Sequence, residues 1–417
     1  MEFFDNLGNL VEQKWRERHY GPHSLPEAAL QALKSLPPRE HVTPEQIIRW
    51  VVEENNLPFQ HDLSEDFGQP PLTVYWGSDF RIEVLFWVTG LPGIHQHAFS
   101  GAFHVLEGSS LHTVYEFNLH KVLGARLLTG DISLKRAELL RAGASVPIVS
   151  GREFIHSTFH LDRPSVSVVV RTHRDQDRLP QYVYLPPSIA YDPYETPYPL
   201  VRRAQILRML ASCERVEALD NNFARVCESK DPFAILYSLL QVYPLLRKQN
   251  RHRLVSLVSC SDHDFFTALQ ASLAFVEQRD RILKLRHRTA GRELRFLLAV
   301  LLVVQGRESV LDLVRQAFPE QSPTELILNC LQGLSDNFAV ESQLSEDLLL
   351  LLRWKLESFT EQEIRFRWRL RRAGTGQIEA DSDLLRLEAL LKEHWLLEPL
   401  LAGSFARSPH SQCVLTA

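Results

Sequence analysis

The stretch Gly93-Ile94-His95-Gln96-His97, with the residues that follow it as far as Gly108, decides how this chain is interpreted. It lies between segments in which apolar and polar residues alternate, which is the period of a β-strand. Two histidines two residues apart on a strand point to the same side of a sheet. Because imidazole is the commonest nitrogen ligand of catalytic metals, this pair offers two coordination positions of a metal ion.

A third histidine ends the segment Gly151-Arg152-Glu153-Phe154-Ile155-His156, in a second strand-rich stretch. We therefore predict that His95, His97 and His156 bind one metal ion. Three nitrogen ligands suit Fe(II), and they also suit zinc, nickel and copper. His160 lies an even number of residues from His156, so both share one face of a regular strand. His160 could orient or replace a ligand, or be an ordinary buried histidine.

The segment around these histidines has the pattern of a β domain. Alternation predicts strands at residues 73–76, 80–88, 102–107, 111–117, 145–149, 154–161 and 165–172. Short strands at close spacing, with glycines between several of them, favour a small barrel or sandwich over a parallel α/β sheet. His104 alternates with Phe103 and Val105, so we expect it to face away from the metal site.

The flanking segments have helical periodicity. We predict an α+β protein of five parts: helices in residues 1–70 that pack on a β-barrel in residues 71–180, a proline- and tyrosine-rich connection over its surface in residues 181–200, an all-helical domain in residues 201–403, and a disordered tail in residues 404–417. The helical domain contains no Walker, HExxH or GxSxG motif. It could cap the barrel, form a dimer or bind a protein partner.

Composition limits the classes of partner. The 417 residues are 45% hydrophobic and 23% charged, as in ordinary globular proteins, and the net charge of −5 gives no general attraction to nucleic acid. The stretch Arg365–Arg372 alternates arginines with aromatic residues and could contact nucleic acid, but its acidic neighbours favour a solvated structural segment. No apolar run approaches the roughly 20 residues of a membrane span. We expect neither a nucleic-acid nor a membrane partner.

The cysteines and the N-terminus bear on location. The five cysteines are scattered, and none belongs to a CxxC pair. An odd number without a framework suggests a reducing compartment and argues against a cysteine-ligated zinc site. The residues after Met1 lack a basic region followed by an apolar run, so no secretory signal is visible. The expected location is the cytoplasm.

The histidine-bearing stretches resemble the cupin family, and within it the cysteine dioxygenase-like (thiol dioxygenase) branch. The first cupin motif runs HxH, three or four residues, usually Glu, six residues, Gly. Here His95-Gln96-His97 is followed by Gly101 in the glutamate position and by Gly108 in the closing position. The second motif, a glycine and then His-x3-Asn, is matched by Gly151 and His156, with His160 in the asparagine position. The similarity extends over residues 80–117 and 134–171.

The resemblance implies a jelly-roll β-barrel with a mononuclear Fe(II) site. Thiol dioxygenases also lack the motif glutamate and bind iron through three neutral histidines. Without a carboxylate ligand the iron keeps its full positive charge, which favours a thiolate co-ligand. The implied reaction inserts both atoms of O2 into a small or peptide-borne thiol and gives a sulfinate.

Several positions depart from the branch. Some members carry a cysteine, crosslinked to a tyrosine, at the position of Gly101. Their Ser-x-His-x-Tyr set falls on Ser167, Val169 and Arg171, so only the serine is present.

Their Tyr-x-Arg substrate clamp has no clean equivalent, and Tyr75 and Arg81 are the nearest candidates. We expect Tyr75, Arg81 and Ser167 in the substrate pocket, with Arg81 reaching a substrate carboxylate unless it forms an ion pair at the rim. These departures argue against free cysteine as the substrate. Two alternatives stay open. One is a non-enzymatic cupin whose metal or ligand binding acts through the helical domain, and the other is a metal-dependent isomerase or hydrolase.

Overall fold

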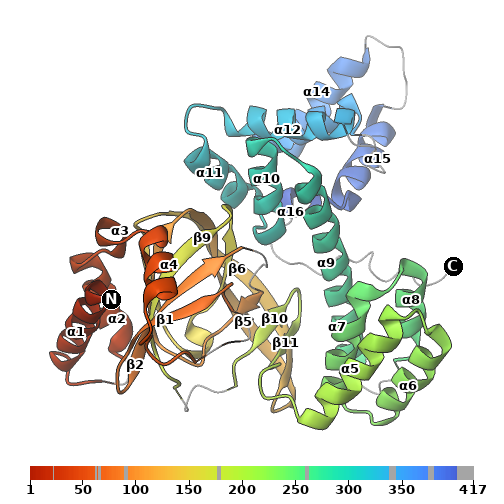
Figure 1. Ribbon diagram of the computed structural model, residues 1–417. Helices are drawn as coiled ribbons and strands as arrows, with labels where there is room; N and C mark the ends of the chain where they lie inside the picture. The colour runs from red at the N-terminus through yellow and green to blue at the C-terminus, as the bar shows by residue number, and fades with distance from the viewer. Residues whose placement is uncertain are drawn as a thin grey trace. The chain divides into compact units, whose positions relative to one another are not determined.

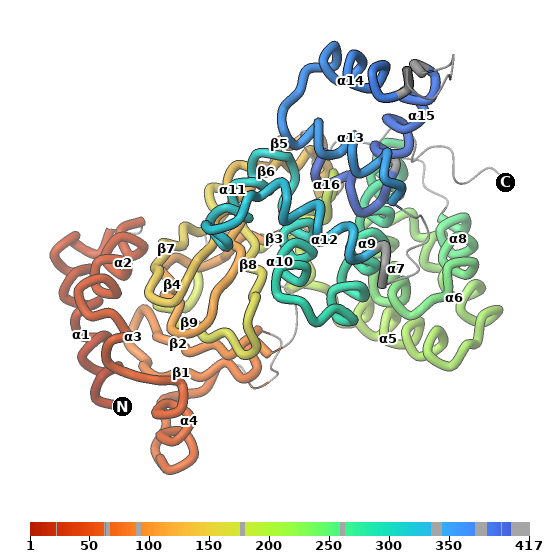
Figure 2. The backbone as a smooth tube through the Cα atoms, turned by 90° about the horizontal axis from the view of Figure 1, so that it is seen from above, coloured from red at the N-terminus to blue at the C-terminus, as the bar shows by residue number. Residues whose placement is uncertain are grey.

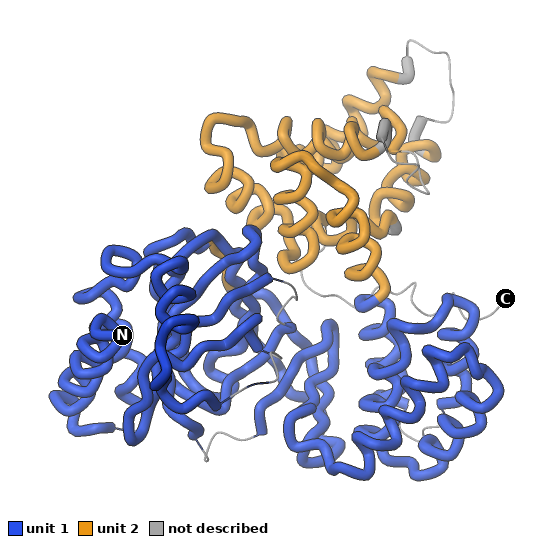
Figure 3. Tube along the Cα trace, in the orientation of Figure 1, with its two compact units in different colours: residues 1–135, 140–276, 407–417 blue, residues 136–139, 277–406 orange. Residues whose placement is uncertain are grey.

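The computed structural model describes residues 1–21, 23–61, 63, 67–88, 93–175, 180–258, 263–337, 344–373 and 380–401. The tail from residue 404, for which we expected disorder, lies outside these ranges. The described residues form two compact units, one within residues 1–135 and 140–276 and one within residues 136–139 and 277–401 (Figure 3). Each unit is described by itself.

The chain begins with four helices, as the sequence predicts: α1 (Glu2–Arg16), α2 (Leu25–Ser35), α3 (Pro38–His41) and α4 (Pro44–Glu53). A capping box begins α4, because the Thr43 side chain accepts from the Gln46 backbone N–H while the Gln46 side chain accepts from the Thr43 N–H. The apolar faces of the helices share one buried core with a β-sheet, and α2 packs on that sheet (Figures 1 and 2).

Two antiparallel sheets form the β domain, residues 71–191. The first has the order β1 (Pro71–Trp76), β2 (Phe80–Trp87), β9 (Ser165–Thr172), β4 (Gly101–Glu107) and β7 (Ser145–Ile148). The second is closed and has the order β10 (Val183–Leu185), β11 (Ile189–Tyr191), β6 (Leu127–Arg141), β5 (Ser109–Gly124), β8 (Ile155–His160) and β3 (Ile94–His95). This two-sheet arrangement is of the jelly-roll type, and it confirms the predicted α+β class.

The alternation of β2 separates the two faces of the first sheet. Ile82 and Val84 belong to the core under the N-terminal helices, whereas Leu85 and Trp87 line a pocket inside the β domain. A strand places successive side chains on opposite faces, so one short sequence serves both a packing core and a pocket wall.

The proline-rich segment at residues 181–200 differs from the expected surface connection. It contains β10 and β11, which pair with β3 and β6 and so close the second sheet. Pro186 and Pro187 lie in the turn between the two strands, where a missing N–H interrupts no ladder. The segment therefore builds the barrel that holds the candidate site.

From residue 198 the described chain is helical, as predicted. The helices are α5 (Tyr198–Ser212), α6 (Val216–Glu228), α7 (Pro232–Val242), α8 (Lys248–Ser256), α9 (His263–Arg288), α10 (Arg292–Val303), α11 (Arg307–Ala317), α12 (Pro323–Asn337), α13 (Glu346–Leu356), α14 (Glu361–Ala373), α15 (Ala380–Glu393) and α16 (Glu398–Leu401). None of the helices in the described ranges combines the length and the apolar character needed to cross a membrane.

The helices do not form one block that begins at residue 201. Those from α5 to the start of α9 share a hydrophobic core with Leu127 and Ile189 of the β domain. Along the chain, the boundary between the two compact units falls within α9, between residues 276 and 277. The first helices of the C-terminal half thus belong with the barrel, and only the later ones form a separate unit.

The arginine-rich stretch forms α14 of the second unit. Trp368 is fully buried, and the Arg371 guanidinium lies 3.3 Å from a carboxylate oxygen of Asp347. The Arg367 guanidinium lies 4.0 Å from the ring centroid of Phe359. These contacts are those of a packed helix, and the absence of a nucleic-acid partner stays a prediction.

Candidate metal centre

Strand pairing places the three histidines of the two motifs together. His95 on β3 is directly opposite His156 on β8, so both side chains lie on the same side of the sheet. The other edge of β3 pairs with β10 through Val183. His97 follows two residues after His95, and its carbonyl accepts a 2.8 Å hydrogen bond from the Gly151 N–H. Gly151 has φ +80°, a conformation that favours glycine. The hydrogen bond from Gly151 to His97 joins the segment that carries the first histidine motif to the segment that carries the second.

The ring nitrogens of these histidines converge. The Nε2 atoms of His97 and His156 are 2.8 Å apart. The His95 Nδ1–H donates to the Gly93 carbonyl at 2.8 Å, which fixes the tautomer and leaves Nε2 as a bare lone pair. That Nε2 atom is buried and has no hydrogen-bond partner among the described residues. One ligand atom from each residue lies within 4.8 Å of the others, so the group could hold a metal ion.

The donor set fits a divalent transition metal. Metal–imidazole bonds are about 2.0–2.1 Å long, so two nitrogens in neighbouring positions around one ion are about 3 Å apart. The separation of 2.8 Å between His97 Nε2 and His156 Nε2 matches this value. An unpartnered buried nitrogen is costly in a folded protein, and a metal ion would remove that cost at His95.

Burial keeps these imidazoles neutral. The exposed fraction is 7% for His95, 3% for His97 and 4% for His156. Desolvation lowers the pKa of His95, and it lowers the pKa of His97 and His156 well below the usual value. Mutual repulsion, which opposes a second proton in the histidine cluster, adds to this for His97 and His156, and the charge of Arg171 adds to it for His97. Metals bind the neutral form of imidazole, so the three side chains are ready to coordinate at neutral pH.

A fourth histidine, His112 on β5, was not identified from the sequence. It is fully buried, and its Nε2 lies 3.1 Å from His156 Nδ1. In the tautomer that leaves His156 Nε2 free for a metal, the Nδ1–H of His156 donates to His112. The register of β5 against β8, which pairs His112 with Thr158, brings the two rings together. The sequence around His112 gives no sign of which residues of β8 it will be opposite.

The position where many cupins carry a glutamate cannot hold a side chain. A Cβ atom added at Gly101 would lie 1.9 Å from the Val170 carbonyl oxygen on the neighbouring strand. Neither a carboxylate nor a cysteine fits there without moving the backbone of β9. The candidate centre therefore consists of three neutral nitrogen donors.

The three histidines line a largely apolar pocket with a volume of about 50 Å³. Its described lining is Phe67, Leu85, Trp87, His95, His97, Phe99, Phe103, Val105, Ser110, Ile148, His156, Thr158, His160, Ser165, Ser167 and Val169. None of these residues is an arginine, lysine, aspartate or glutamate. Ser167 lies in the pocket, and its Oγ accepts from the Trp87 indole N–H at 2.9 Å.

Tyr75 lies outside the pocket. A β-bulge between Thr73 and Tyr75 shifts the register of β1 against β2. The Tyr75 ring packs instead with the core under the N-terminal helices, stacked on Phe80 at 5.5 Å and against Gly8 of α1. The bulge reverses the face that simple alternation assigns to this residue.

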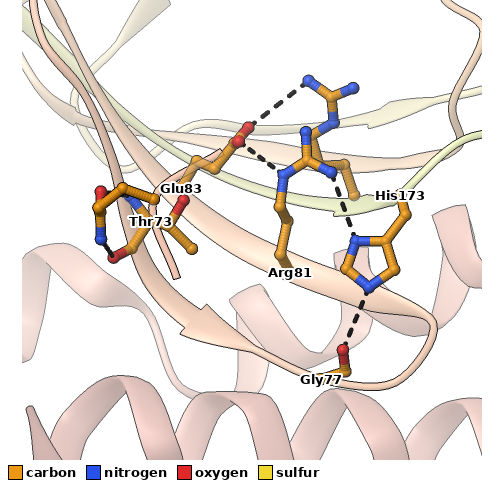
Figure 4. A network of polar contacts seen from close by, with 7 residues as sticks. Thr73, Gly77, Arg81, Glu83 and His173 are labelled. Carbon is orange, nitrogen blue, oxygen red and sulfur yellow. Dashed lines mark hydrogen bonds and ion pairs between the residues drawn. The ribbon is translucent and has the colours of Figure 1, made fainter. Parts of the chain in front are cut away.

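Arg81 also lies outside the pocket lining, and it forms no ion pair at a rim. It is buried, with Nε donating to Glu83 at 2.6 Å and Nη1 3.4 Å from His173 Nδ1 (Figure 4). A second guanidinium, from Arg171, lies 3.5 Å from the other oxygen of Glu83. Arg81 is therefore already engaged with protein partners, and the geometry offers it no substrate carboxylate.

No protein-family model matches the chain, and no curated protein is similar to it in sequence. Among solved structures it is similar to a cupin-2 domain containing protein from Shewanella frigidimarina, with 15% identity over 32% of this chain and 96% of that one and a TM-score of 0.19. It is also similar to KdgF from Halomonas sp., with 14% identity over 30% of this chain and 100% of that one and a TM-score of 0.19. The DMSP lyase DddQ from Ruegeria pomeroyi is similar with 16% identity over 38% of this chain and 77% of that one and a TM-score of 0.22. At TM-scores of this size the similarities assign neither an activity nor a ligand to this chain.

Proposed function

We propose that His95, His97 and His156 bind a divalent metal ion, with Fe(II) as the first candidate, and that the protein uses O2 to oxidise a thiol at this centre. One observation carries the proposal: three buried imidazole nitrogens converge on one point, and the Nε2 atom of His95 has no hydrogen-bond partner among the described residues. A convergent set of neutral lone pairs in a protein interior is what a metal ion requires.

The donor set supports a thiol as the substrate. With no carboxylate ligand, a bound Fe(II) ion would keep its full positive charge, which favours a thiolate. The same ion would activate O2 by electron transfer, with no net change in the iron over the reaction. The overall reaction is R–SH + O2 → R–SO2H. Two S–O bonds form, the O–O bond breaks, and sulfur supplies all four electrons, so no further reductant is needed.

The chain's own residues shield the centre from water. The Phe99 ring centroid lies 4.2 Å from that of His97, and the Phe154 ring centroid lies 4.5 Å from that of His156. Phe103 lines the pocket as well. Aromatic walls of this kind exclude water and leave the sulfur of a bound thiol as the group to be oxidised.

The test is O2 consumption together with sulfinate formation, measured with a panel of thiols. Iron-loaded wild type is compared with His97→Gln and with His104→Gln, a matched control. His104 is equally buried, but its Nδ1 pairs with the Ser145 Oγ at 2.8 Å, outside the pocket lining. We expect uptake in the wild type and in His104→Gln, and none in His97→Gln. Iron-loaded wild type that consumes no O2 with any thiol would contradict the oxidase chemistry and favour a non-catalytic metal-binding role.

A further inference from the structure

The pocket has two chemically different ends along strand β8. His156, Thr158 and His160 alternate on this strand, and all three line the pocket. At a rise of about 3.3 Å per residue, the Cα atoms of His156 and His160 are about 13 Å apart. The pocket thus extends from the metal ligands toward a second polar group, which we call the serine end: Ser110, His160, Ser165 and Ser167.

The His160 ring is held in place at this serine end. Its Nδ1 lies 2.9 Å from the Oγ of Ser110, the residue directly opposite in the β5–β8 ladder. The ring is stacked on the Trp87 indole, with centroids 4.5 Å apart and an interplanar angle of 15°. Trp87 in turn donates to Ser167. A ring fixed on one edge and one face presents its remaining nitrogen in a defined direction.

That remaining nitrogen has no protein partner. The Nε2 atom of His160 is buried and unpaired among the described residues, and the residue lines the pocket. Ser167 Oγ accepts from the indole, so its own O–H is available to donate to a ligand. A buried polar atom without a partner costs free energy that a bound ligand would recover.

The serine end is uncharged. Burial lowers the pKa of His160 to about 3, so the imidazole is neutral at physiological pH. The described pocket lining contains no charged side chain to accompany a carboxylate or an ammonium group. Moving an unpaired charge into such a site is strongly unfavourable. A hydroxyl or amide loses only its hydrogen bonds to water, and the hydrogen bonds that it forms in the site replace them.

We propose that His160 and Ser167 hydrogen-bond an uncharged polar group at the far end of the thiol substrate. This inference rests on the proposed function, because the metal is what fixes the sulfur. The substrate class is then a slim, uncharged thiol with a hydroxyl or amide several bonds from sulfur, and not a thiol carboxylate. The volume of about 50 Å³ agrees, since it has room for roughly four water-sized groups.

The test measures thiol binding without turnover. In cobalt(II)-loaded protein, a thiolate bound to the metal changes the visible absorption, which gives a dissociation constant for each thiol. The probes are hydroxyalkanethiols of increasing chain length, with the alkanethiol and the thiol carboxylate of each length as references. We expect one hydroxyalkanethiol length to bind roughly tenfold more tightly than either reference, the size of one to two net hydrogen bonds.

Two variants locate the effect. His160→Phe keeps a ring against Trp87 and removes both nitrogens, and Ser167→Ala removes one hydroxyl. In each, the preference for the hydroxyl thiol over the alkanethiol of the same length should fall toward none, whereas His104→Gln, outside the pocket lining, should keep the wild-type preference and the wild-type cobalt spectrum. Equal binding of the carboxylate and the hydroxyl thiol, or an intact preference in both variants, would overturn the inference. So would a cobalt spectrum that no thiol alters.

The outcome is separable from that of the proposed function. A hydroxyl preference that depends on His160, found together with iron-loaded protein that consumes no O2, would support the inference and contradict the proposed oxidation of thiols. O2 uptake with thiol carboxylates as the best substrates would do the reverse. A protein that takes up no cobalt would contradict both.

Discussion

Two clusters of basic side chains lie inside the same β domain, and they avoid an uncompensated buried charge in different ways. In the first, the Arg81 guanidinium pairs with the carboxylate of Glu83 (Figure 4), and the Arg171 guanidinium lies 3.5 Å from the other oxygen of that carboxylate. In the second, His95, His97 and His156 meet with no acidic residue in the pocket lining. The first cluster balances charge with charge, and the second stays neutral and leaves a lone pair unused. In this comparison the basic groups that meet an acid are structural, and the neutral histidines whose nitrogens converge are the candidate ligands.

The clusters are close enough to influence each other. Arg81 and Arg171 are directly opposite in the β2–β9 ladder. The Arg171 guanidinium lies 3.5 Å from the Phe99 ring centroid, and that ring lies 4.2 Å from His97. The positive charge of Arg171 contributes to the lowered pKa of His97. The charged cluster thus helps to keep a metal ligand deprotonated.

The largest effect is expected from breaking the charged cluster. Glu83→Ala leaves the buried guanidinium of Arg81 and the partly buried guanidinium of Arg171 without their carboxylate, and should lower the free energy of unfolding by about 3–5 kcal/mol. The control is Glu116→Ala, which removes an exposed ion pair with Lys135 and should cost about 1 kcal/mol or less. Chemical denaturation measures both. A loss at Glu83 no larger than that at Glu116 would mean that the cluster does not depend on its acid.

The histidine cluster should respond to metal instead. Cobalt or zinc at a hundred times its dissociation constant should raise the free energy of unfolding of the wild type by about 2.7 kcal/mol. The same metal should leave His97→Gln unchanged, because one of three ligands is missing. Denaturation curves with metal and with a chelator test this. Equal stabilisation of wild type and variant would place the bound metal elsewhere.

A smaller effect is expected one contact away from the ligands. His112→Phe removes the partner of His156 Nδ1 and should weaken metal affinity about 10- to 100-fold. Competition with a chromogenic chelator measures the affinity, and His104→Gln should retain the wild-type value. Unchanged affinity in His112→Phe would show that His156 is oriented by packing alone.

The last effect concerns pH, measured without metal in a chelator, and it is spread over more than two pH units. Burial lowers the pKa of His104 from 6.5 to about 4. Below pH 6.5 the unfolded chain therefore takes up a proton that the folded protein refuses, so the free energy of unfolding falls as pH falls from 6.5 to 4. The slope from this residue is at most about 1.4 kcal/mol per pH unit. His104→Gln should show a correspondingly shallower fall between pH 6.5 and 4. An identical slope in both proteins would contradict the assignment.

How far the sequence could predict this site depends on distance along the chain. The period of two is a local signal, and it correctly predicts β1, β2, β4, β7, β8, β9 and the two faces of β2. It does not predict β6 (Leu127–Arg141) or the second half of β5. Tyr75 was expected in the substrate pocket but lies on the other face of the strand, because the bulge between Thr73 and Tyr75 changes the alternation. Arg81 shows the same limit, since its partner Glu83 is local but His173 is reached only through the folded sheet.

Register is the information that a single sequence lacks. His112 meets His156 only because β5 and β8 pair in one register out of several that their alternation allows. The strands β10 and β11 were hidden in a proline-rich segment, because their prolines lie in the turn rather than in the ladder. In both places, long-range pairing decides what the local pattern leaves open.

The most direct test of the account is the metal content of the purified protein, measured by elemental mass spectrometry after supply of iron, cobalt or zinc. Wild type is compared with His95→Gln, His97→Gln and His156→Gln, and with His104→Gln as the folded control. We expect about one metal ion per chain in the wild type and the control, and roughly a tenth of that or less in each ligand variant. Full metal content in the three variants, or none in the wild type, would contradict a metal centre at these histidines.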